Sequence, residues 1–295
     1  MTALSDDTLQ VRAPAKINLT LSVTGRRPDG FHDLESWVAF VDCHDELRIE
    51  RSTSFRLEVD NDEAVPTDDR NLVHRAAHAL AQEAGVNAGA VIRLHKRIPA
   101  GAGLGGGSSD AAACLIGLSH LWGLGLGRDK LAAIGAGIGS DVPLFFHGGQ
   151  LVMRGRGELI EPLDRAMEGF VALICPPLHV STAEVYAAHA RSGTSPAAPR
   201  PWERGPMSCE RIAPQLFNDL EQAAFEVEPA LRRLHDRLDG LEGRPVRVTG
   251  SGAAMFALFD DEVGARAWAD AATPVAGGAL VRVHRIMTNT KAIQI

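Results

Sequence analysis

The chain has 295 residues, of which 45% are hydrophobic and 23% are charged, and this composition is typical of a globular protein with one large domain or two ordinary ones. A net charge of −7 without a Lys/Arg-rich run disfavours nucleic-acid binding, and no apolar stretch approaches the roughly 20 residues that a membrane helix needs. The four cysteines form no C-x-x-C pair and the N-terminal segment has no apolar signal core, so we expect a reducing compartment, the cytoplasm.

The first half of the chain predicts strands around a few helices. Residues 11–25 alternate apolar and polar side chains, so that Ile17 and Leu19 share one face of a strand while Lys16 and Asn18 share the other. Further strands are expected over residues 34–41, 46–50, 55–59 and 90–99 and from residue 150 onward, with a helix over residues 68–85 and another over residues 108–125.

The pattern changes after residue 162, so we expect two domains, residues 1–162 and residues 163–295, in an α+β fold with antiparallel strand pairing. A Pro-, Gly- and Ser-rich loop is expected at residues 191–208. The second half predicts strands over residues 171–177, 246–249, 255–259 and 279–284, helices over residues 181–190 and 262–272, and two helices between residues 218 and 241.

The strongest local signal for function is the segment PAGAGLGGGSSD, residues 99–110. Five of the seven positions from 101 to 107 are glycine, which permits positive φ angles and a close approach of the backbone to a ligand. Backbone N–H groups at the start of a helix bind phosphate, because they lack partners within the helix and face its positive end. The alternative is a flexible turn whose serines and aspartate only cap the helix, but the glycine density favours a phosphate site.

Three common site motifs fit the sequence poorly. The run GAGLGG matches the dinucleotide fingerprint, but Pro99 precedes it, and residues 124–126 are Leu, Gly and Leu where an acidic residue is needed. A P-loop is excluded because no G-K-[ST] supplies its lysine. His74 and His78 lie four apart on a helix without the glutamate of a zinc-protease motif, so we expect no metal held by the protein itself.

A lysine and a carboxylate elsewhere offer the charges that phosphoryl transfer to an alcohol requires. Lys16 and Asn18 on one strand face fit a site and a solvated strand equally well. Asp141, in the segment GSDVPLFF, either points into a site, or it or Ser140 caps a helical turn. As a pair, an aspartate would accept the hydroxyl proton while a lysine offsets charge on the transferred group.

Two other segments leave their interpretation open. The segment TGSGAAMF, residues 249–256, either brings backbone close to a ligand or only connects two strands tightly. Phe31 and His32, just past a turn, either read a base or are a buried Phe beside a surface His, which the residues alone favour. Arg26 and Arg27 are expected to be solvated turn residues.

Three motifs in this order resemble the GHMP small-molecule kinase superfamily: PAKIN, P-x-G-x-G-L-G-G-G-S-S and TGSGAAMF. Within it, GRRPDGFHDLES and GSDVPLFF look like the branch whose members phosphorylate the 2-hydroxyl of a cytidine-diphosphate-linked methylerythritol in the non-mevalonate route to isoprenoids. The resemblance covers residues 13–284. It implies a GHMP-kinase two-domain fold, with a ribosomal-protein-S5-like N-terminal domain, a ferredoxin-like C-terminal domain and the site between them.

The resemblance also implies roles for individual residues. Lys16 and Asp141 would be catalytic, Asn18 would lie near the erythritol, and Phe31 and His32 would contact the cytidine, whose other face Tyr186 would close. It further implies ATP as phosphoryl donor, Mg²⁺ bound with the nucleotide, a small-molecule substrate, and neither nucleic acid nor membrane as a partner. The implied ATP-binding loop consists of Pro99, Ala100, Gly101, Ala102, Gly103, Leu104, Gly105, Gly106, Gly107, Ser108 and Ser109.

Two departures and three alternatives accompany this resemblance. Phe31 stands where many relatives have Tyr, and Asp110 stands where some have Asn, so an extra negative charge is expected near the nucleotide and Mg²⁺. Another GHMP kinase, acting on homoserine or a mevalonate-pathway substrate, would not need Phe31 and His32. The remaining alternatives are a nicotinamide-dependent oxidoreductase built on GAGLGG and a catalytically silent nucleotide-binding protein.

Overall fold

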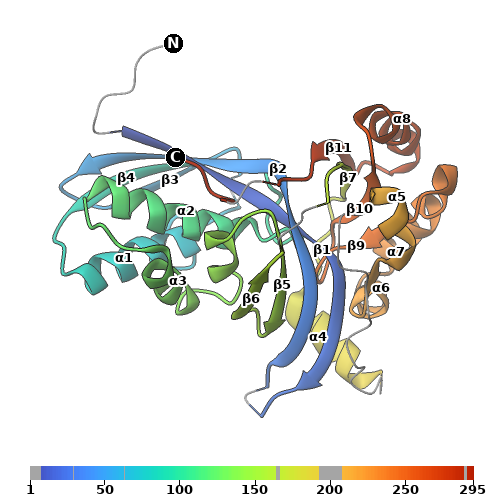
Figure 1. The fold of residues 1–295 in the computed structure, drawn as a ribbon, viewed down its shortest axis with the longest axis horizontal. Helices are drawn as coiled ribbons and strands as arrows, with labels where there is room; N and C mark the ends of the chain where they lie inside the picture. The colour runs from blue at the N-terminus through green and yellow to red at the C-terminus, as the bar shows by residue number, and fades with distance from the viewer. Residues whose placement is uncertain (1–7, 29, 63, 164–166, 193–207, 289–290) are drawn as a thin grey trace.

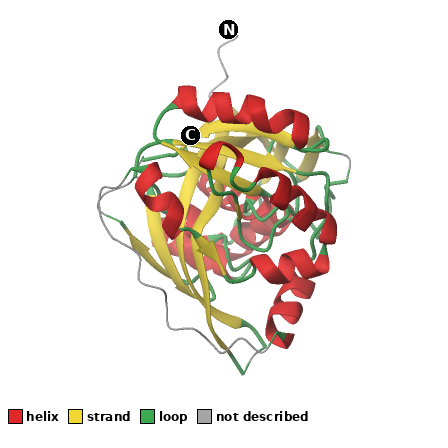
Figure 2. Ribbon diagram, turned by 90° about the vertical axis from the view of Figure 1, so that its right-hand side faces the viewer, coloured by secondary structure: helices red, strands yellow, loops and turns green. Residues whose placement is uncertain are grey.

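The computed structural model describes residues 8–28, 30–62, 64–163, 167–192, 208–288 and 291–295. Within these residues, two β-sheets pack together and carry helices on their outer sides (Figure 1, Figure 2). The chain therefore has the α+β architecture that the order of its predicted elements indicates.

The first sheet is built on two long antiparallel strands, β1 (Thr8–Arg26) and β2 (His32–Ser52). The two separate strands expected at residues 34–41 and 46–50 are one strand. Between them, His44 and Asp45 pair with β1, while Asp42 and Cys43 lie in a register shift opposite Pro14/Ala15. Both β3–β4 and β1–β8 pair parallel, which the expectation of antiparallel pairing missed. The other strands of this sheet are β3 (Arg56–Asp60), β4 (Gly89–His95), β5 (Gln150–Gly155), β6 (Leu159–Pro162) and β8 (Phe217–Asn218).

Three helices lie on one side of this sheet: α1 (Leu72–Ala84), α2 (Gly106–Leu121) and α3 (Arg128–Ala136) (Figure 1). The predicted start and stop of α1 are confirmed, because the Asn71 side chain accepts a hydrogen bond from the Val73 N–H and Gly85 ends the helix in the left-handed conformation. The central helix α2 is buried on most of its surface, since it packs on β1 and β2 and also on α1 and α3.

The second sheet contains four antiparallel strands in the order β11-β7-β10-β9. With helices after the first and third of these strands in the chain, this is the β-α-β-β-α-β arrangement of a ferredoxin-like domain. Its strands are β7 (Phe170–Cys175), β9 (Arg247–Val248), β10 (Met255–Phe259) and β11 (Leu280–Arg285), and its helices are α4 (Thr182–Arg191), α5 (Cys209–Ile212), α6 (Glu221–Val227), α7 (Pro229–Leu238) and α8 (Glu262–Ala272). Short 3₁₀ turns lie at η1 (Pro143–Phe146), η2 (Ala213–Gln215), η3 (Leu241–Gly243) and η4 (Thr273–Val275).

The sequence analysis missed α3, α5, β6 and β8, which are short or lie in segments rich in glycine and charge. Of the loop expected at residues 191–208, residues 193–207 lie outside the described residues. All four cysteines are buried and free. No helix of the described residues is long and apolar enough to cross a membrane.

The alternation along β1 decides what each of its faces contacts. Ile17 and Leu19 are fully buried in the apolar layer between the sheets, where they pack with Val171 and Leu173 of β7. Lys16 and Asn18 point to the opposite side, as the sequence predicts. The strand thus uses one face for the contact between the sheets and leaves the other for the site.

Candidate active site

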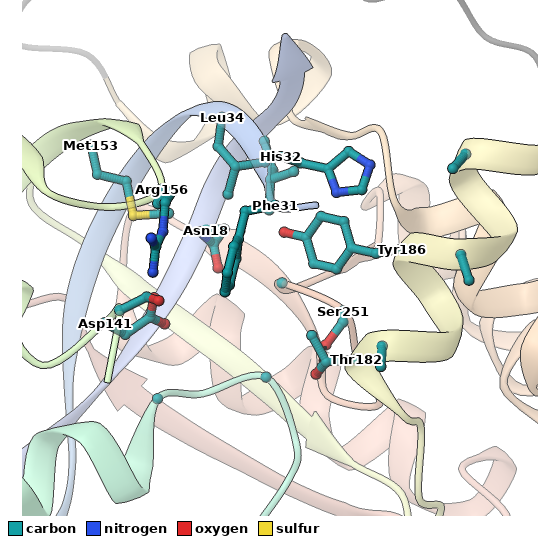
Figure 3. Close-up of a pocket in the computed structure, with 18 of the residues that line it drawn as sticks. Asn18, Phe31, His32, Leu34, Asp141, Met153, Arg156, Thr182, Tyr186 and Ser251 are labelled. Carbon is teal, nitrogen blue, oxygen red and sulfur yellow. Dashed lines mark hydrogen bonds between the residues drawn. The ribbon is translucent and has the colours of Figure 1, made fainter. Parts of the chain in front are cut away.

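A cavity of about 700 Å³ lies where segments from both sheets meet. Lys16 and Asn18 of β1, Phe31 and His32 at the start of β2, Asp141 before η1 and Tyr186 of α4 all line it (Figure 3). Of the implied ATP-binding loop, residues 99–109, the glycines Gly103 and Gly105 line it too. The fold therefore brings together six single residues and one loop that are scattered over more than half of the sequence.

Lys16 and Asp141 form the charged centre of this cavity. The Lys16 Nζ lies 4.0 Å from the Asp141 Oδ2 and donates a hydrogen bond of 2.6 Å to the Asn18 Oδ1. The amide of Asn18 in turn donates to the Ser36 Oγ at 2.8 Å, which fixes its orientation. Burial lowers the pKa of Lys16, and the charge of Asp141 partly offsets this effect.

The capping role considered for Asp141 is wrong, because η1 begins after Val142 and no side chain caps it. The carboxylate is instead free to face the cavity from the turn before η1, and about a third of its side chain is exposed. Asp141 therefore has the position that its site interpretation requires.

The glycine loop leads directly into α2, whose first turn has no capping side chain. The helix begins at Gly106, so Ser108 and Ser109 lie inside it, and the interpretation of the serines as caps is wrong. Gly105, the N-cap residue, has a φ of +70° and packs so closely on Lys16 that a Cβ there would lie 3.1 Å from the Lys16 Cγ. The start of α2 thus presents uncapped N–H groups beside the lysine, an arrangement that suits a phosphate.

The two glycine motifs of the sequence contact each other. The Ala254 N–H donates to the Ala102 carbonyl at 3.0 Å, and the Asn18 N–H donates to the Thr249 Oγ1 at 2.9 Å. The segment TGSGAAMF does connect β9 to β10, but Gly250 and Ser251 also line the cavity. The tight connection between strands is thus confirmed, and the approach of this segment to a ligand stays a prediction.

The sequence analysis expected Asp110 to add a negative charge near the nucleotide, but its side chain is paired with Lys96. It is buried and accepts a hydrogen bond of 2.7 Å from the Lys96 Nζ, which also donates to Asp45. Burial and the nearby Asp45 raise the pKa of Asp110 to about 8, although Lys96 acts in the opposite direction. Asp45 also accepts hydrogen bonds from the N–H groups of Arg97 and Ile98, so this cluster joins the segment before the glycine loop to the helix after it.

The aromatic corner of the cavity is formed by Phe31, His32 and Tyr186. Phe31 is 49% exposed, so the expectation of a buried Phe from the residues alone is wrong. His32 and Tyr186 stack on each other with ring centroids 5.0 Å apart and an angle of 23° between the planes. Burial, helped by the charges of His189 and Arg26, lowers the pKa of His32 and favours its neutral form.

Sequence reasoning did not assign Arg26, Arg156 or Thr182 to the cavity that they line. Arg26 is exposed at the end of β1, as expected for an arginine beside a turn, and it also lines the cavity. Arg156 follows β5 as the central residue of a Gly-Arg-Gly sequence, residues 155–157, which we call the G-R-G turn. Thr182 and Ser251 join α4 to the TGSGAAMF segment by a hydrogen bond of 2.8 Å. The G-R-G turn was the one available signal for Arg156, whereas nothing in the local sequence pairs Thr182 with Ser251.

Comparison with known proteins agrees with this arrangement. The chain matches the family model of the GHMP kinases N terminal domain over residues 71–149 and that of the GHMP kinases C terminal over residues 208–273. It is 38% identical over 280 residues to the 4-diphosphocytidyl-2-C-methyl-D-erythritol kinase of Gloeobacter violaceus, covering 92% of this chain and 91% of that protein. It is 40% identical over 255 residues to the kinase of the same name from Bacillus cytotoxicus, covering 85% of this chain and 88% of that protein.

Solved structures give the same result. A crystal structure of a 4-(cytidine 5'-diphospho)-2C-methyl-D-erythritol kinase superposes with a TM-score of 0.79 at 34% identity and covers 95% of this chain and all of that one. A homoserine kinase from Cytophaga hutchinsonii superposes over the whole of this chain and 99% of its own with a TM-score of 0.73, but at 18% identity it shows the fold alone. By its cavity, its fold and its sequence identity to these relatives, the chain belongs to the 4-diphosphocytidyl-2-C-methyl-D-erythritol kinase family of the GHMP kinases.

Proposed function

We propose that the protein transfers the γ-phosphoryl group of ATP to the 2-hydroxyl of 4-diphosphocytidyl-2-C-methyl-D-erythritol. The observation that carries this proposal is the Lys16–Asp141 pair, 4.0 Å apart in a cavity that also holds an aromatic corner and reaches the glycine loop. A phosphoryl-transfer site needs a proton acceptor, a cation and a place for the donor phosphates, and each has a candidate here.

The spacing of the pair suits an alcohol oxygen between the two head groups. Lys16 Nζ and Asp141 Oδ2 are 4.0 Å apart, so one oxygen beside the line that joins them can lie at a hydrogen-bond distance of about 2.8 Å from both. In this position Asp141 accepts the hydroxyl proton while Lys16 stabilises the oxyanion and the transferred group. Asn18 holds the lysine amine in place through their hydrogen bond of 2.6 Å.

The donor side of the site uses backbone rather than side chains. The uncapped start of α2 and the glycines before it offer N–H groups to the triphosphate. Among the described residues, no three His, Cys, Asp or Glu side chains lie together as a metal cluster. In this proposal, Mg²⁺ is therefore carried mainly by the phosphates of the nucleotide. Bound with the nucleotide, such an ion would offset the negative charge of the phosphates.

The acceptor side would hold the cytidine at the aromatic corner. Phe31 and Tyr186 would stack on the base, and neutral His32 would hydrogen-bond its edge. In this proposal residues 1–162 form the domain with the catalytic pair and the nucleotide loop, while residues 163–295 contribute Tyr186 and the TGSGAAMF segment. The buried free cysteines are consistent with a cytoplasmic enzyme.

One assay tests the proposal directly. ADP release from Mg·ATP is measured with no acceptor, with the cytidylyl-erythritol acceptor, and with homoserine or mevalonate in its place. We expect release only with the cytidylyl acceptor. Equal release with homoserine or mevalonate would assign the chain to another GHMP activity, and no release with any acceptor would contradict the proposed kinase.

A further inference from the structure

The G-R-G turn after β5 places a cation in the acceptor part of the cavity. Gly155 and Gly157 have φ angles of +67° and +113°, and the Gly157 N–H donates to the Arg154 carbonyl at 3.1 Å. The Arg156 N–H donates to the Glu158 carboxylate at 2.5 Å. These contacts fix a tight turn whose central side chain reaches into the space between Phe31 and Asp141 (Figure 3).

Two contacts hold this turn against both parts of the acceptor site. The Arg156 guanidinium carbon lies 4.0 Å from the centroid of the Phe31 ring, a cation–π distance. On its other side, Gly157 packs on the turn of the reacting carboxylate, because a Cβ there would lie 3.2 Å from the Ser140 carbonyl oxygen and 3.8 Å from the Asp141 Oδ1. Arg156 is therefore located between the aromatic corner and the reacting carboxylate.

The charge of the cavity differs in sign from that of the whole protein. Although the chain carries a net charge of −7, the described residues that line the cavity include the cations Lys16, Arg26 and Arg156 and a single carboxylate, Asp141. A local excess of positive charge attracts an anionic ligand, and a planar guanidinium matches the oxygens of a phosphate group in a bidentate manner.

We propose that Arg156 is a specificity-determining residue that binds the diphosphate of the acceptor, so that this linker, and not only the base, is read. The inference deepens the proposed function and rests on it, because a diphosphate joins the base to the alcohol in that acceptor. With the base at Phe31 and the alcohol at Asp141, the diphosphate passes the guanidinium between them.

The experiment compares Arg156→Met with the wild type in the binding of cytidine and of cytidine diphosphate, measured by calorimetry, and in steady-state kinetics. Wild type is expected to bind cytidine diphosphate more tightly than cytidine. Arg156→Met should lose about 10- to 100-fold of this advantage, the range for a lost charge-assisted hydrogen bond, and should raise the KM of the acceptor while the KM of ATP stays unchanged. Arg156→Lys should regain part of the advantage, since it keeps the charge but not the planar fork.

Arg266→Met is the matched control, because it removes one arginine charge from the outer surface of α8, where Arg266 pairs only with Glu262 among the described residues. It should bind both ligands as the wild type does. An equal loss of cytidine and cytidine diphosphate in Arg156→Met would overturn the proposal, since Arg156 would then only support the Phe31 ring, and so would the absence of any loss. If the wild type itself releases no ADP with the acceptor, the proposed function fails, whereas the calorimetric comparison still decides whether Arg156 binds a diphosphate.

Discussion

Lys16 is the residue on which most contacts of the candidate site converge. Its N–H donates to the Leu104 carbonyl of the glycine loop at 2.9 Å, its amine donates to Asn18, and the same amine faces Asp141. Burial without such neighbours would favour the neutral amine. The charge of Asp141 therefore serves the proposed proton transfer and also raises the pKa of Lys16, which favours the protonated amine.

Replacing Asp141 by Asn tests these two roles together. We expect kcat to fall by roughly 10²- to 10⁴-fold, the usual contribution of a general base. Because Asp141 raises the pKa of Lys16, the lysine of the variant should lose its proton at a lower pH. As the pH rises, the residual activity of the variant should therefore decline earlier than the activity of the wild type. Steady-state rates between neutral and alkaline pH measure both effects, and near-normal turnover would leave Asp141 with a positioning role alone.

Replacing Phe31 by Ala tests the aromatic corner. Base stacking on an aromatic side chain contributes about 1–3 kcal/mol, so the acceptor should bind roughly 5- to 150-fold more weakly. Since this binding energy comes from a part of the substrate that does not react, some loss of kcat is expected as well. The KM values of ATP and of the acceptor are measured separately, and an equal rise in both would contradict the assignment of Phe31 to the acceptor.

The sequence alone indicated those site residues that belong to a recognisable local pattern, such as a strand alternation or a glycine-rich loop. The alternation of β1 placed Lys16 beside Asn18, and the glycine density located the loop. Sequence reasoning did not find the positions of Arg156 and Thr182 in the cavity, because each acquires its position only when elements far away in the chain fold against it. The stack of Tyr186 on His32 likewise joins residues that no local pattern connects.

At the scale of elements, the site depends on how tightly the two glycine motifs pack. A Cβ on Gly103 would lie 2.4 Å from the Thr249 carbonyl oxygen, and the φ of Gly103 is +80°. Gly103→Ala should therefore force the loop away from the TGSGAAMF segment and weaken ATP binding and turnover together. The matched control is Gly127→Ala, where φ is −68° and no atom lies within 4 Å of the new methyl group.

Nucleotide affinity and thermal unfolding, measured for both alanine variants, check this prediction. Gly127→Ala should stay close to the wild type in both. An unchanged nucleotide affinity in Gly103→Ala would show that the loop tolerates the displacement, and the contact between the two motifs would then have no part in binding ATP.

Most elements could be predicted because capping residues and the periodicity of apolar side chains define their boundaries. Asn71 and Gly85 define α1, and the bounds of β10 and α8 agree with the sequence pattern residue for residue. The merging of two predicted strands into β2 could not be predicted, because residues 42–45 have no strand pattern of their own, and the strand continues past a register shift only through pairs such as those of His44 and Asp45 with β1. Here a tertiary contact overrides a local preference.

At the scale of the whole molecule, an aspartate–histidine pair connects the two sheets. The Asp42 carboxylate of β2 accepts hydrogen bonds from the Arg285 N–H at 2.9 Å and from the His284 ring at 3.2 Å, both on β11. Burial disfavours the charged imidazole, but the hydrogen bonds to Asp42 and Cys43 and the charge of Asp42 outweigh it and raise the pKa of His284 to about 9. The folded protein therefore binds a proton here that the unfolded chain releases at lower pH.

The pH dependence of stability follows from this difference. The unfolded histidine titrates near 6.5, so the stabilisation is complete below about pH 6.5 and is lost as the pH rises through 9. We expect the melting temperature of the wild type to fall over this window and that of Asp42→Asn to fall less, since the amide still accepts from Arg285 but offers no charge to His284. Thermal unfolding of both proteins between pH 6 and pH 9.5 measures this difference. If the melting temperatures of the two proteins fell equally with pH, the Asp42–His284 pair would not be the cause.

The site is completed by residues that come late in the chain. Lys16, the glycine loop and Asp141 belong to the first half, but Tyr186, Gly250 and Ser251 close the cavity, and β8 covers the edge of β1. During synthesis on a ribosome, where the N-terminal part leaves the exit tunnel first, the proposed catalytic pair emerges before the walls that would enclose a ligand. A nascent chain that stops short of residue 250 would thus carry Lys16 and Asp141 without a closed cavity around them.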